Sequence, residues 1–270
     1  MEGFNNFNHH ILEEKLKLVA KTLASLEGVL EEELKQLGAE DTLQLKRAVS
    51  FTGNMEVLYR TNLWCRTAMN ILMEIHSFSF DSNESFYSQI RGIDWTQWMS
   101  KDSKLWIHAT IHESIFNHSQ FVAQLAKDAI VDLFREKTGD RPSVDRFDAD
   151  IVINLYINRD ECTVSIDSSG EPLFKRGYRQ AGHPATLNEV LGAGLILLSG
   201  WDKKQDLFDP MCGSGTIPIE AAMIAANIAP GLIRNQFGFQ KWPGFNKSLW
   251  NNLLSEARTK KIVPKARIFG

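Results

Sequence analysis

The sequence Leu207-Phe-Asp-Pro-Met-Cys-Gly-Ser-Gly-Thr216, followed by residues 217–226, decides how the chain is organised. Leu207 and Phe208 favour the end of a short buried strand, and the residues after Thr216 favour a helix. Gly213 and Gly215 lack Cβ atoms, so the backbone between strand and helix can turn sharply and approach a ligand closely. The stretch therefore predicts a strand, a glycine turn and a helix.

The beginning of that predicted helix favours a negatively charged ligand group. Pro218 is tolerated there because first-turn N–H groups have no partner within the helix. Those free N–H groups and the helix dipole attract an anion. Asp209, at the carboxyl end of the strand, can accept hydrogen bonds from ammonium or hydroxyl groups. The residues therefore indicate a zwitterionic or nucleoside-like cofactor, and a tight turn that only packs is the alternative.

The spacing of the glycines argues against two common nucleotide-binding motifs. It is not G-x-G-x-x-G, the ordinary NAD fingerprint, and no G-x-x-x-x-G-K-[ST] phosphate loop occurs. The whole string D-P-M-C-G-S-G-T, followed by I-x-I-E-A-A, resembles the first cofactor motif of S-adenosylmethionine-dependent methyltransferases that modify exocyclic amino groups of nucleobases. The resemblance implies cofactor contacts from Asp209, Pro210, Cys212, Gly213, Ser214, Gly215 and Thr216.

Length and composition limit the class of protein. A chain of 270 residues predicts roughly two domains, and a hydrophobic content of 43% is sufficient for real cores. The net charge of −3 does not by itself indicate a nucleic-acid-binding protein, so an RNA site would have to be a local basic patch.

The cysteines and the apolar runs predict the compartment. The three cysteines, Cys65, Cys162 and Cys212, are scattered, which indicates a reducing environment and neither a disulfide framework nor a zinc site. We see no signal peptide and no apolar run near the roughly 18 residues that span a bilayer. We therefore expect a cytoplasmic protein with no membrane partner and no metal.

Periodicity predicts the remaining elements. In the first part we expect a strand at 16–21, a helix at 26–37, a strand at 43–51, a turn at 52–54, a helix at 55–66 and a strand at 69–75. This is close to the β-α-β-β-α-β order of ferredoxin-like domains. The following module is expected to contain a helix at 84–90, a strand at 105–112, a helix at 119–137 and a hairpin at 151–166. Helices at 185–198 and 248–261 and a strand at 266–270 complete the prediction.

Two stretches could contact RNA. Arg141 and Arg146, in the loop 139–146, could hold phosphates, and the alternative is ordinary surface ion pairing with Asp140 and Asp145. In the second stretch, cations alternate with aromatic residues, which fits backbone contact combined with base stacking. Its candidate RNA-binding residues are Lys175, Arg176, Tyr178 and Arg179. The alternative there is a short basic linker.

One strand places two histidines on the same face. His108 and His112 share it with Thr110, and no Cys or carboxylate cluster accompanies them at metal-ligand spacing. We interpret them as surface or packing histidines.

The chain resembles THUMP-domain RNA methyltransferases over nearly its whole length. The specific pieces are A-S-L-E-G-V-L-E-E-E-L-K-Q-L-G-A, I-D-W at 93–95, R-P-S-V-D-R at 141–146, K-R-G-Y-R at 175–179 and the string at 207–223. The fold class that this implies is α/β and α+β. We expect a ferredoxin-like segment at 15–56, a THUMP RNA-binding domain at 57–168, a linker at 169–184 and the beginning of a Rossmann-like class I methyltransferase domain at 185–270.

The resemblance further implies S-adenosyl-L-methionine as methyl donor and guanine N2 of large-subunit ribosomal RNA as target. It also places the helix that begins near Pro184 beside the cofactor. In the family, an acidic residue and an Asn-Pro-Pro-Tyr motif follow further on, and neither N-P-P-Y nor D-P-P-Y occurs in these 270 residues. We therefore expect an inactive fragment of a longer enzyme and assign no catalytic residue. The alternatives are a non-catalytic RNA-binding module and a DNA adenine methyltransferase.

Overall fold

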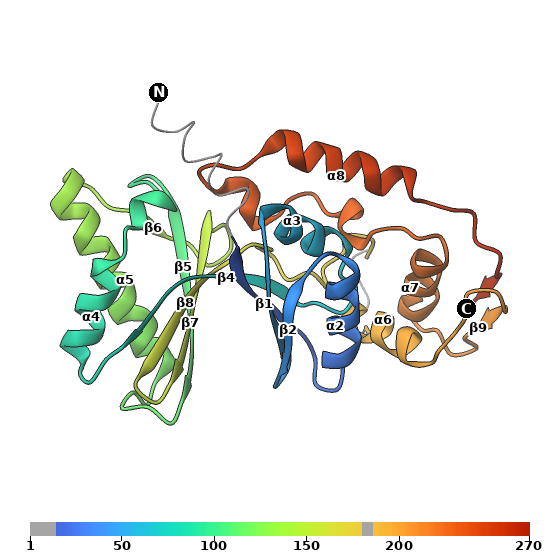
Figure 1. The fold of residues 1–270 in the computed structure, drawn as a ribbon, viewed down its shortest axis with the longest axis horizontal. Helices are drawn as coiled ribbons and strands as arrows, with labels where there is room; N and C mark the ends of the chain where they lie inside the picture. The colour runs from blue at the N-terminus through green and yellow to red at the C-terminus, as the bar shows by residue number, and fades with distance from the viewer. Residues whose placement is uncertain (1–14, 180–185) are drawn as a thin grey trace. The chain divides into compact units, whose positions relative to one another are not determined.

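The computed structural model describes residues 15–179 and 186–270. Within these ranges the chain forms two compact units, whose elements are labelled in Figure 1. The first unit comprises the described residues of 1–71, 171–237 and 246–270, and the second comprises 72–170 and 238–245. Our predicted boundary at residue 56 lies inside the first unit, which continues to Ile71.

The first unit begins with a small sheet covered by two helices. Its elements are β1 (Leu16–Lys21), α2 (Glu27–Gln36), β2 (Glu40–Leu45), β3 (Ala48–Gly53), α3 (Met55–Trp64) and the beginning of β4 (Asn70–Ser79). β3 pairs antiparallel with both β1 and β2. Alternating residues of the strands, such as Leu18 and Phe51, are buried, and so are Leu30 and Leu34 of α2 and Leu58 of α3.

Two predicted elements of this part are wrong. Thr52 and Gly53 of the turn expected at 52–54 belong to β3, and Asn54 is the N-cap of α3. The single strand expected at 43–51 is a hairpin of β2 and β3, in which Arg47 turns the chain at a φ of +59°. β2 is almost entirely exposed, with Leu43 and Leu45 on the surface. In the sequence, Leu43 and Leu45 alternate in phase with Val49 and Phe51, so the two strands read as a single strand.

The same unit continues with the elements around the glycine turn. They are α6 (Glu189–Leu198), β9 (Leu207–Phe208), α7 (Thr216–Ala225), η2 (Pro230–Ile233), α8 (Lys247–Thr259) and β10 (Ile268–Phe269). β9 and β10 pair in parallel, and α6 and α7 lie side by side next to β9 in Figure 1. A cluster of Ile196, Ala221 and Ile224 joins the two helices, and Leu207 and Ile268 pack against it. The predicted helix, strand and glycine turn are therefore confirmed, but the expectation that the strand is buried is wrong, since Phe208 is 70% exposed and Leu207 is half-buried.

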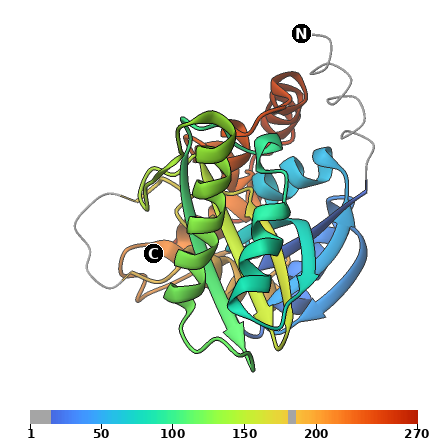
Figure 2. The same ribbon diagram turned by 90° about the vertical axis from the view of Figure 1, so that its left-hand side faces the viewer.

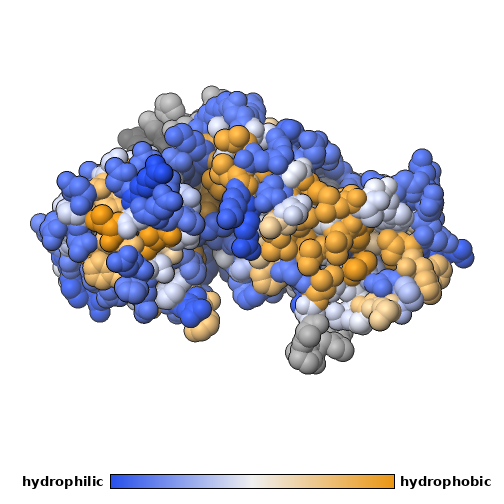
Figure 3. Space-filling model, turned by 90° about the horizontal axis from the view of Figure 1, so that it is seen from below, coloured by the Kyte–Doolittle hydropathy of each residue, from blue (hydrophilic) through white to orange (hydrophobic). Residues whose placement is uncertain are grey.

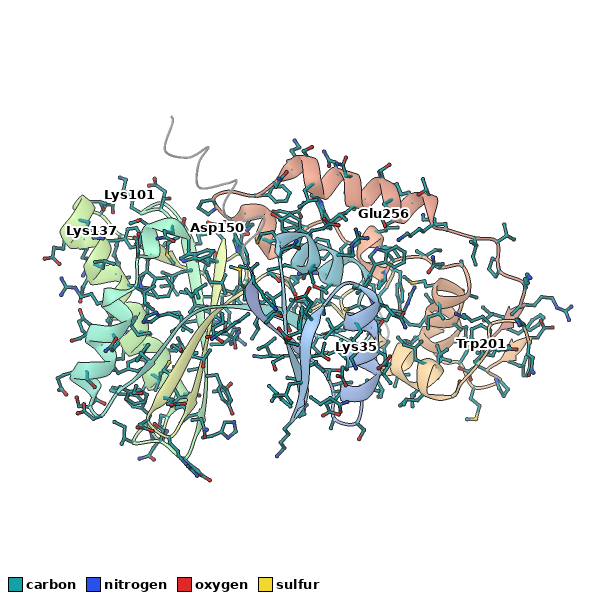
Figure 4. All side chains as sticks on the ribbon, viewed as in Figure 1. Lys35, Lys101, Lys137, Asp150, Trp201 and Glu256 are labelled. Atoms are coloured by element: carbon teal, nitrogen blue, oxygen red, sulfur yellow. The ribbon has the colours of Figure 1, made fainter. Side chains whose placement is uncertain are left out.

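Helix α8 is attached to α3 by an ion pair and by aromatic packing. Arg60 Nη1 lies 2.8 Å from Glu256 Oε1, and the rings of Tyr59 and Trp250 meet edge to face. Glu256 is labelled on α8 in Figure 4. Arg60 and Lys260 lower the pKa of Glu256 to about 2. The C-terminal helix is thus tied by charge to the N-terminal part of the first unit.

This ion pair predicts an acid-dependent loss of stability. A carboxylate whose pKa falls on folding stabilises the native state above its ordinary pKa near 4.5, and it stops doing so as the pH falls toward about 2. We expect Glu256→Gln to lower the unfolding temperature at pH 7. The difference in unfolding temperature between the variant and the wild type should shrink as the pH falls from 4.5 to 2. Thermal melting followed by circular dichroism checks this, and a gap that is independent of pH contradicts it.

The second unit contains five neighbouring strands of an eight-stranded sheet and one helical layer. The strand order is β4, β8 (Glu161–Asp167), β7 (Ile151–Asn158), β5 (Lys104–His112) and β6 (Ser143–Val144). The helical layer consists of α4 (Asn83–Gly92) and α5 (Ser119–Thr138), which Figure 2 shows side by side over the sheet. Two short 3-10 segments, η1 (Trp95–Gln97) and η3 (Gly238–Lys241), complete the unit. The predicted strand at 105–112, the helix at 119–137 and the hairpin at 151–166 are confirmed.

The strands of the second unit have one apolar and one polar face. Leu105 and Ile107 of β5 and Ile153 and Leu155 of β7 are buried, whereas the intervening His108 is exposed. Because successive side chains of a strand alternate between faces, the apolar set faces the helices and the intervening set lies on the opposite face. On that face His108 and Tyr156 are exposed, whereas Asn154 and Ser165 are buried. We call it the open face.

The surface adds two observations. Figure 3 shows a broad apolar region over the part of the first unit that holds α6, α7 and β9 in Figure 1, and Leu195, Leu198 and Phe208 of these elements are exposed. Among the described residues, no helix is both long and apolar enough to cross a membrane. Over the same residues we find no group of three or more His, Cys, Asp or Glu arranged to hold a metal ion.

Candidate functional site

The glycine turn starts from a fixed strand end. The N–H of Leu207 donates to the carbonyl of Arg267 at 3.0 Å, and the N–H of Asp209 donates to that of Phe269 at 2.9 Å. Asp209 therefore lies directly past β9, at the carboxyl end of a parallel pair. This is where ligands bind in open α/β sheets.

The turn itself uses two left-handed glycines. Gly213 has a φ of +55° and Gly215 a φ of +76°, conformations that glycine adopts without strain. The N–H of Gly215 donates to the carbonyl of Cys212, which closes the turn. A Cβ atom built on Gly213 would meet no atom within 4 Å. No side chain therefore fills the turn at Gly213, and a ligand can approach its backbone.

The seven predicted cofactor residues lie on this one turn and the helix start. Pro210 and Gly213 are exposed, Asp209, Cys212, Ser214 and Gly215 are half-buried, and Thr216 is buried. The Thr216 hydroxyl lies 3.4 Å from the carbonyl oxygen of Leu187 and 3.3 Å from the Ser214 hydroxyl. Thr216 thus connects the beginning of α7 to the segment before α6.

Helix α6 lies beside the turn because glycines allow close packing. A Cβ on Gly192 would come within 3.1 Å of the Thr216 methyl group, and one on Gly194 would come within 2.6 Å of Leu26. The sequence predicted the helix at 185–198, whereas it begins at Glu189 after the N-cap Asn188. The start of that prediction, including Pro184, lies outside the described residues.

Glu220 of α7, one helical turn after Thr216, forms a buried ion pair with Arg176. Arg176 is 1% exposed and Glu220 is fully buried, and Arg176 Nε lies 3.5 Å from Glu220 Oε1. The Arg176 guanidinium also donates to the carbonyls of Leu173 and Arg66. The prediction that Arg176 contacts RNA therefore conflicts with its position, since all of its donor groups face the protein interior.

Tyr178 is part of the same buried group. Its hydroxyl donates to Glu220 Oε1 at 2.9 Å. Burial and the negative charge of Glu220 raise the pKa of Tyr178 well above its ordinary value. The phenol therefore stays protonated and remains a donor, which fits a structural role more closely than base stacking.

Arg66 links this group to the N-terminal part of the first unit. Its guanidinium donates to the carbonyl of Ile228 at 2.9 Å, and burial lowers its pKa. The backbone N–H groups of Arg66 and Thr67 donate to the two carboxylate oxygens of Glu33 at 2.8 and 2.9 Å. Hydrogen bonds from Arg66 and Thr67 thus link α2, the segment that follows α3 and the segment that follows α7.

Sequence reasoning missed Glu220 and its partners. One signal was available, because Glu220 is the single charged residue of Thr216–Ala225. A lone acid in an otherwise apolar helix requires a buried partner. No local pattern, however, indicated which arginine would supply it.

Lys175 and Arg179, the other predicted RNA contacts of this stretch, are engaged with acids. Lys175 is exposed and pairs with Glu171 at 2.8 Å. Arg179 pairs with Glu189 at 2.7 Å and also contacts Thr186. Burial raises the pKa of Glu189. Arg179 therefore holds the beginning of α6, and RNA would have to compete for it.

Arg141 and Arg146 have a different environment. Asp140 pairs with Lys101, and Asp145 accepts from two backbone N–H groups and lies 3.7 Å from Lys104. Within the described ranges, neither arginine has a carboxylate within ion-pairing distance. Asp140 does accept from the backbone N–H of Arg141 at 2.9 Å, and this hydrogen bond and the charge of Arg141 both contribute to the lowered pKa of Asp140.

Family comparisons now give the identity of these parts. The RlmL ferredoxin-like domain matches residues 17–72, the THUMP domain matches 81–167, and UPF0020, an RMKL-like methyltransferase domain, matches 176–270. The three matches place a ferredoxin-like domain, a THUMP domain and a methyltransferase domain along this chain. The Ribosomal RNA large subunit methyltransferase K/L of Syntrophotalea carbinolica is 41% identical over 250 residues, which are 91% of this chain and 35% of that protein.

A second relative has a similar degree of identity. The protein slr0064 of Synechocystis, described as an RNA methyltransferase, is 40% identical over 239 residues, which are 88% of this chain and 62% of that protein. The chain thus spans about one third of the first relative and about three fifths of the second.

Solved structures share the fold. A predicted N6-adenine-specific DNA methylase from Listeria monocytogenes superposes with a TM-score of 0.83 at 29% identity, over 95% of this chain and 66% of that one. SMU.472, described as a methyltransferase and solved as a complex with SAH, superposes with a TM-score of 0.78 at 31% identity, over 92% of this chain and 66% of that one.

Proposed function

We propose that this chain is the RNA-binding part and the first cofactor-binding segment of an S-adenosylmethionine-dependent RNA methyltransferase, with guanine N2 of large-subunit ribosomal RNA as target. The observation that carries the proposal is an open glycine turn at a helix start, in one chain with a THUMP domain. The identity to the K/L enzyme supports the ribosomal substrate, and the SAH complex of SMU.472 supports the cofactor.

The residues of the turn fit such a cofactor. Asp209 Oδ1 accepts from the N–H of Met211, and in the described part of the chain Asp209 Oδ2 accepts no hydrogen bond. Asp209 would accept from ammonium or hydroxyl groups, and the first-turn N–H groups of α7 would face the carboxylate. When bound, S-adenosylmethionine supplies an electrophilic methyl group on its sulfonium.

The chain's own residues would bind and orient, and they would not complete catalysis. Transfer to an aromatic amine requires the amine to be held in line with the methyl group, and much of the rate gain is such positioning. The N-P-P-Y motif that would supply acceptors for the amine is absent from the 270 residues. We therefore expect no methyl transfer by this chain alone and full transfer by a longer protein that contains it.

Gly213→Val tests the proposed cofactor site. The left-handed φ of Gly213 would strain a branched residue at this position. The methyl groups of the introduced valine would also occupy the open space that the ligand needs. In the complete enzyme we expect titration calorimetry with SAH to show no measurable binding.

Gly200→Val is a matched control, because Gly200 also has a positive φ and open space around its Cβ position but lies outside the turn. We expect this variant to bind SAH as the wild type does. If Gly213→Val binds SAH with wild-type affinity, the turn is not the cofactor site.

A DNA adenine methyltransferase is the second candidate function, because the Listeria structure carries that description. An assay of methyl transfer from labelled cofactor by the complete enzyme, with ribosomal RNA and duplex DNA as substrates, separates the two candidate functions. This chain alone is the control. Transfer to RNA alone supports the proposal, and transfer to DNA alone refutes it.

A further inference from the structure

The open face of the second unit's sheet carries a row of aromatic side chains. Trp106, His108 and His112 lie on the same face of β5, because they are separated by even numbers of residues. His108 and His112 are exposed, and Trp106 is half-buried. Tyr156 of β7, opposite Thr110 in the parallel register, is 50% exposed on the same face. Sequence analysis interpreted the two histidines as surface or packing residues.

These rings support one another in two pairs. Trp106 and His108 have ring centroids 5.9 Å apart, and Trp106 Nε1 donates to His108 Nε2 at 3.1 Å. The rings of His112 and Tyr156 have centroids 5.5 Å apart. Rings that hold each other lose little freedom when a ligand binds, so this surface is pre-organised for stacking.

Hydroxyl groups extend the face across the sheet. The register places Thr110 beside Tyr156, Tyr156 beside Thr163, and Thr163 beside Ser77. All four side chains are exposed or half-buried, and none carries a charge. The row therefore offers hydrogen bonds to a polar ligand without repelling an anion.

A cation lies at the end of the aromatic row. The Arg146 guanidinium is 5.8 Å from the centre of the Trp106 ring and 5.9 Å from that of Phe147, which is 93% exposed. The neighbouring acids are already engaged by lysines, since Asp148 pairs with Lys104 and Lys241. Arg146 can therefore meet a phosphate while its planar group stays on the aromatic ring.

We infer that this open face, defined by Trp106, His108, His112, Tyr156 and Arg146, binds a single-stranded segment of RNA. The bases would stack on the rings, and a phosphate would meet Arg146. A duplex hides the faces of its bases, so the face requires unpaired nucleotides. This inference rests on the proposed function, which supplies RNA as the partner.

Fluorescence anisotropy with a labelled single-stranded RNA oligonucleotide, and with its duplex, tests the inference. We expect the whole chain to bind the single strand more tightly than the duplex. Loss of one stacking ring weakens single-strand binding several-fold, so Tyr156→Ala should reduce affinity about five-fold or more, and Tyr156→Phe should restore it. Arg146→Ala should reduce the slope of log affinity against log salt by about 0.7.

Phe121→Ala is the matched control, because Phe121 is an equally exposed ring on α5, in the helical layer. It should bind as the wild type does, and melting curves confirm that each variant is folded. If Tyr156→Ala and Trp106→Ala both bind the single strand with wild-type affinity, the inference is wrong and RNA binds elsewhere. If the wild-type protein binds neither RNA, the proposed RNA partner itself is refuted.

Discussion

Glu220→Leu is expected to lower the free energy of unfolding by about 3–5 kcal/mol, because it leaves the buried Arg176 without its anion. Both side chains are almost completely inaccessible, so water cannot replace the lost partner. Tyr178 would lose the acceptor of its hydroxyl group as well. Urea unfolding followed by circular dichroism measures the loss.

A double-mutant cycle separates the ion pair from simple cavity effects. Replacing both Arg176 and Glu220 with leucine removes both buried charges, so the double variant should lose less than the sum of the two single variants. Arg159→Ala is the control, because its pair with Glu113 is exposed on both sides, and it should leave the unfolding midpoint unchanged. Additive losses, or a Glu220→Leu variant as stable as Arg159→Ala, would contradict the assignment.

The expected consequence extends to the cofactor turn. Glu220 lies one helical turn after Thr216, on the helix that the turn begins. A variant that remains folded but lets α7 shift should bind SAH more weakly in the complete enzyme, while a conservative Glu220→Gln retains an acceptor for Tyr178. Calorimetry with SAH on both variants separates the two explanations. Weaker binding by a variant that is still folded means that Glu220 positions the turn, whereas weaker binding by an unfolded variant reflects only the loss of folding.

Gly231→Ala is expected to lower the free energy of unfolding by about 1–3 kcal/mol through overpacking. A Cβ on Gly231 would lie 2.8 Å from both the Cα and the carbonyl oxygen of Leu63, and 3.0 Å from the ring of Phe237. Because the first two atoms belong to the backbone of α3, η2 would have to move away from that helix. Urea unfolding provides the measurement.

Gly92→Ala is the matched control for this substitution. A Cβ at Gly92 would meet nothing within 4 Å, and its φ is not in the left-handed region. We expect it to leave stability unchanged or to raise it slightly through the unfolded state. Equal losses for the two variants would mean that packing against Leu63 is not the cause.

Local patterns were sufficient for most elements of the fold. The alternation of Leu105 and Ile107 with polar neighbours predicted β5, and the glycines at 213 and 215 predicted the turn before α7. These signals lie within a few residues of one another, so a single sequence contains them. The hairpin of β2 and β3 was missed because Leu43 and Leu45 alternate in phase with Val49 and Phe51, and no Gly, Pro or Asn marks the turn at residues 46–47.

The roles of the cations could not be predicted in the same way. Arg176, Lys175 and Arg179 look alike in sequence, yet Arg176 is buried against Glu220, 44 residues away, and Lys175 pairs with Glu171 at the surface. Arg146 was predicted to contact RNA in the same way as these three residues. Only the structure shows that the neighbouring acids Asp140 and Asp145 lie near Lys101 and Lys104 instead.

Neighbouring residues were enough to predict the strand, the glycine turn and the helix start, because backbone freedom and first-turn N–H groups depend on local sequence. The resemblance to THUMP-domain methyltransferases was visible there too. In contrast, the folded chain was needed to see which charges are buried, which glycines allow close packing and which rings gather on the open sheet face. The physical reason is that burial and pairing join residues far apart in the chain, and their energies depend on partners that no local pattern names.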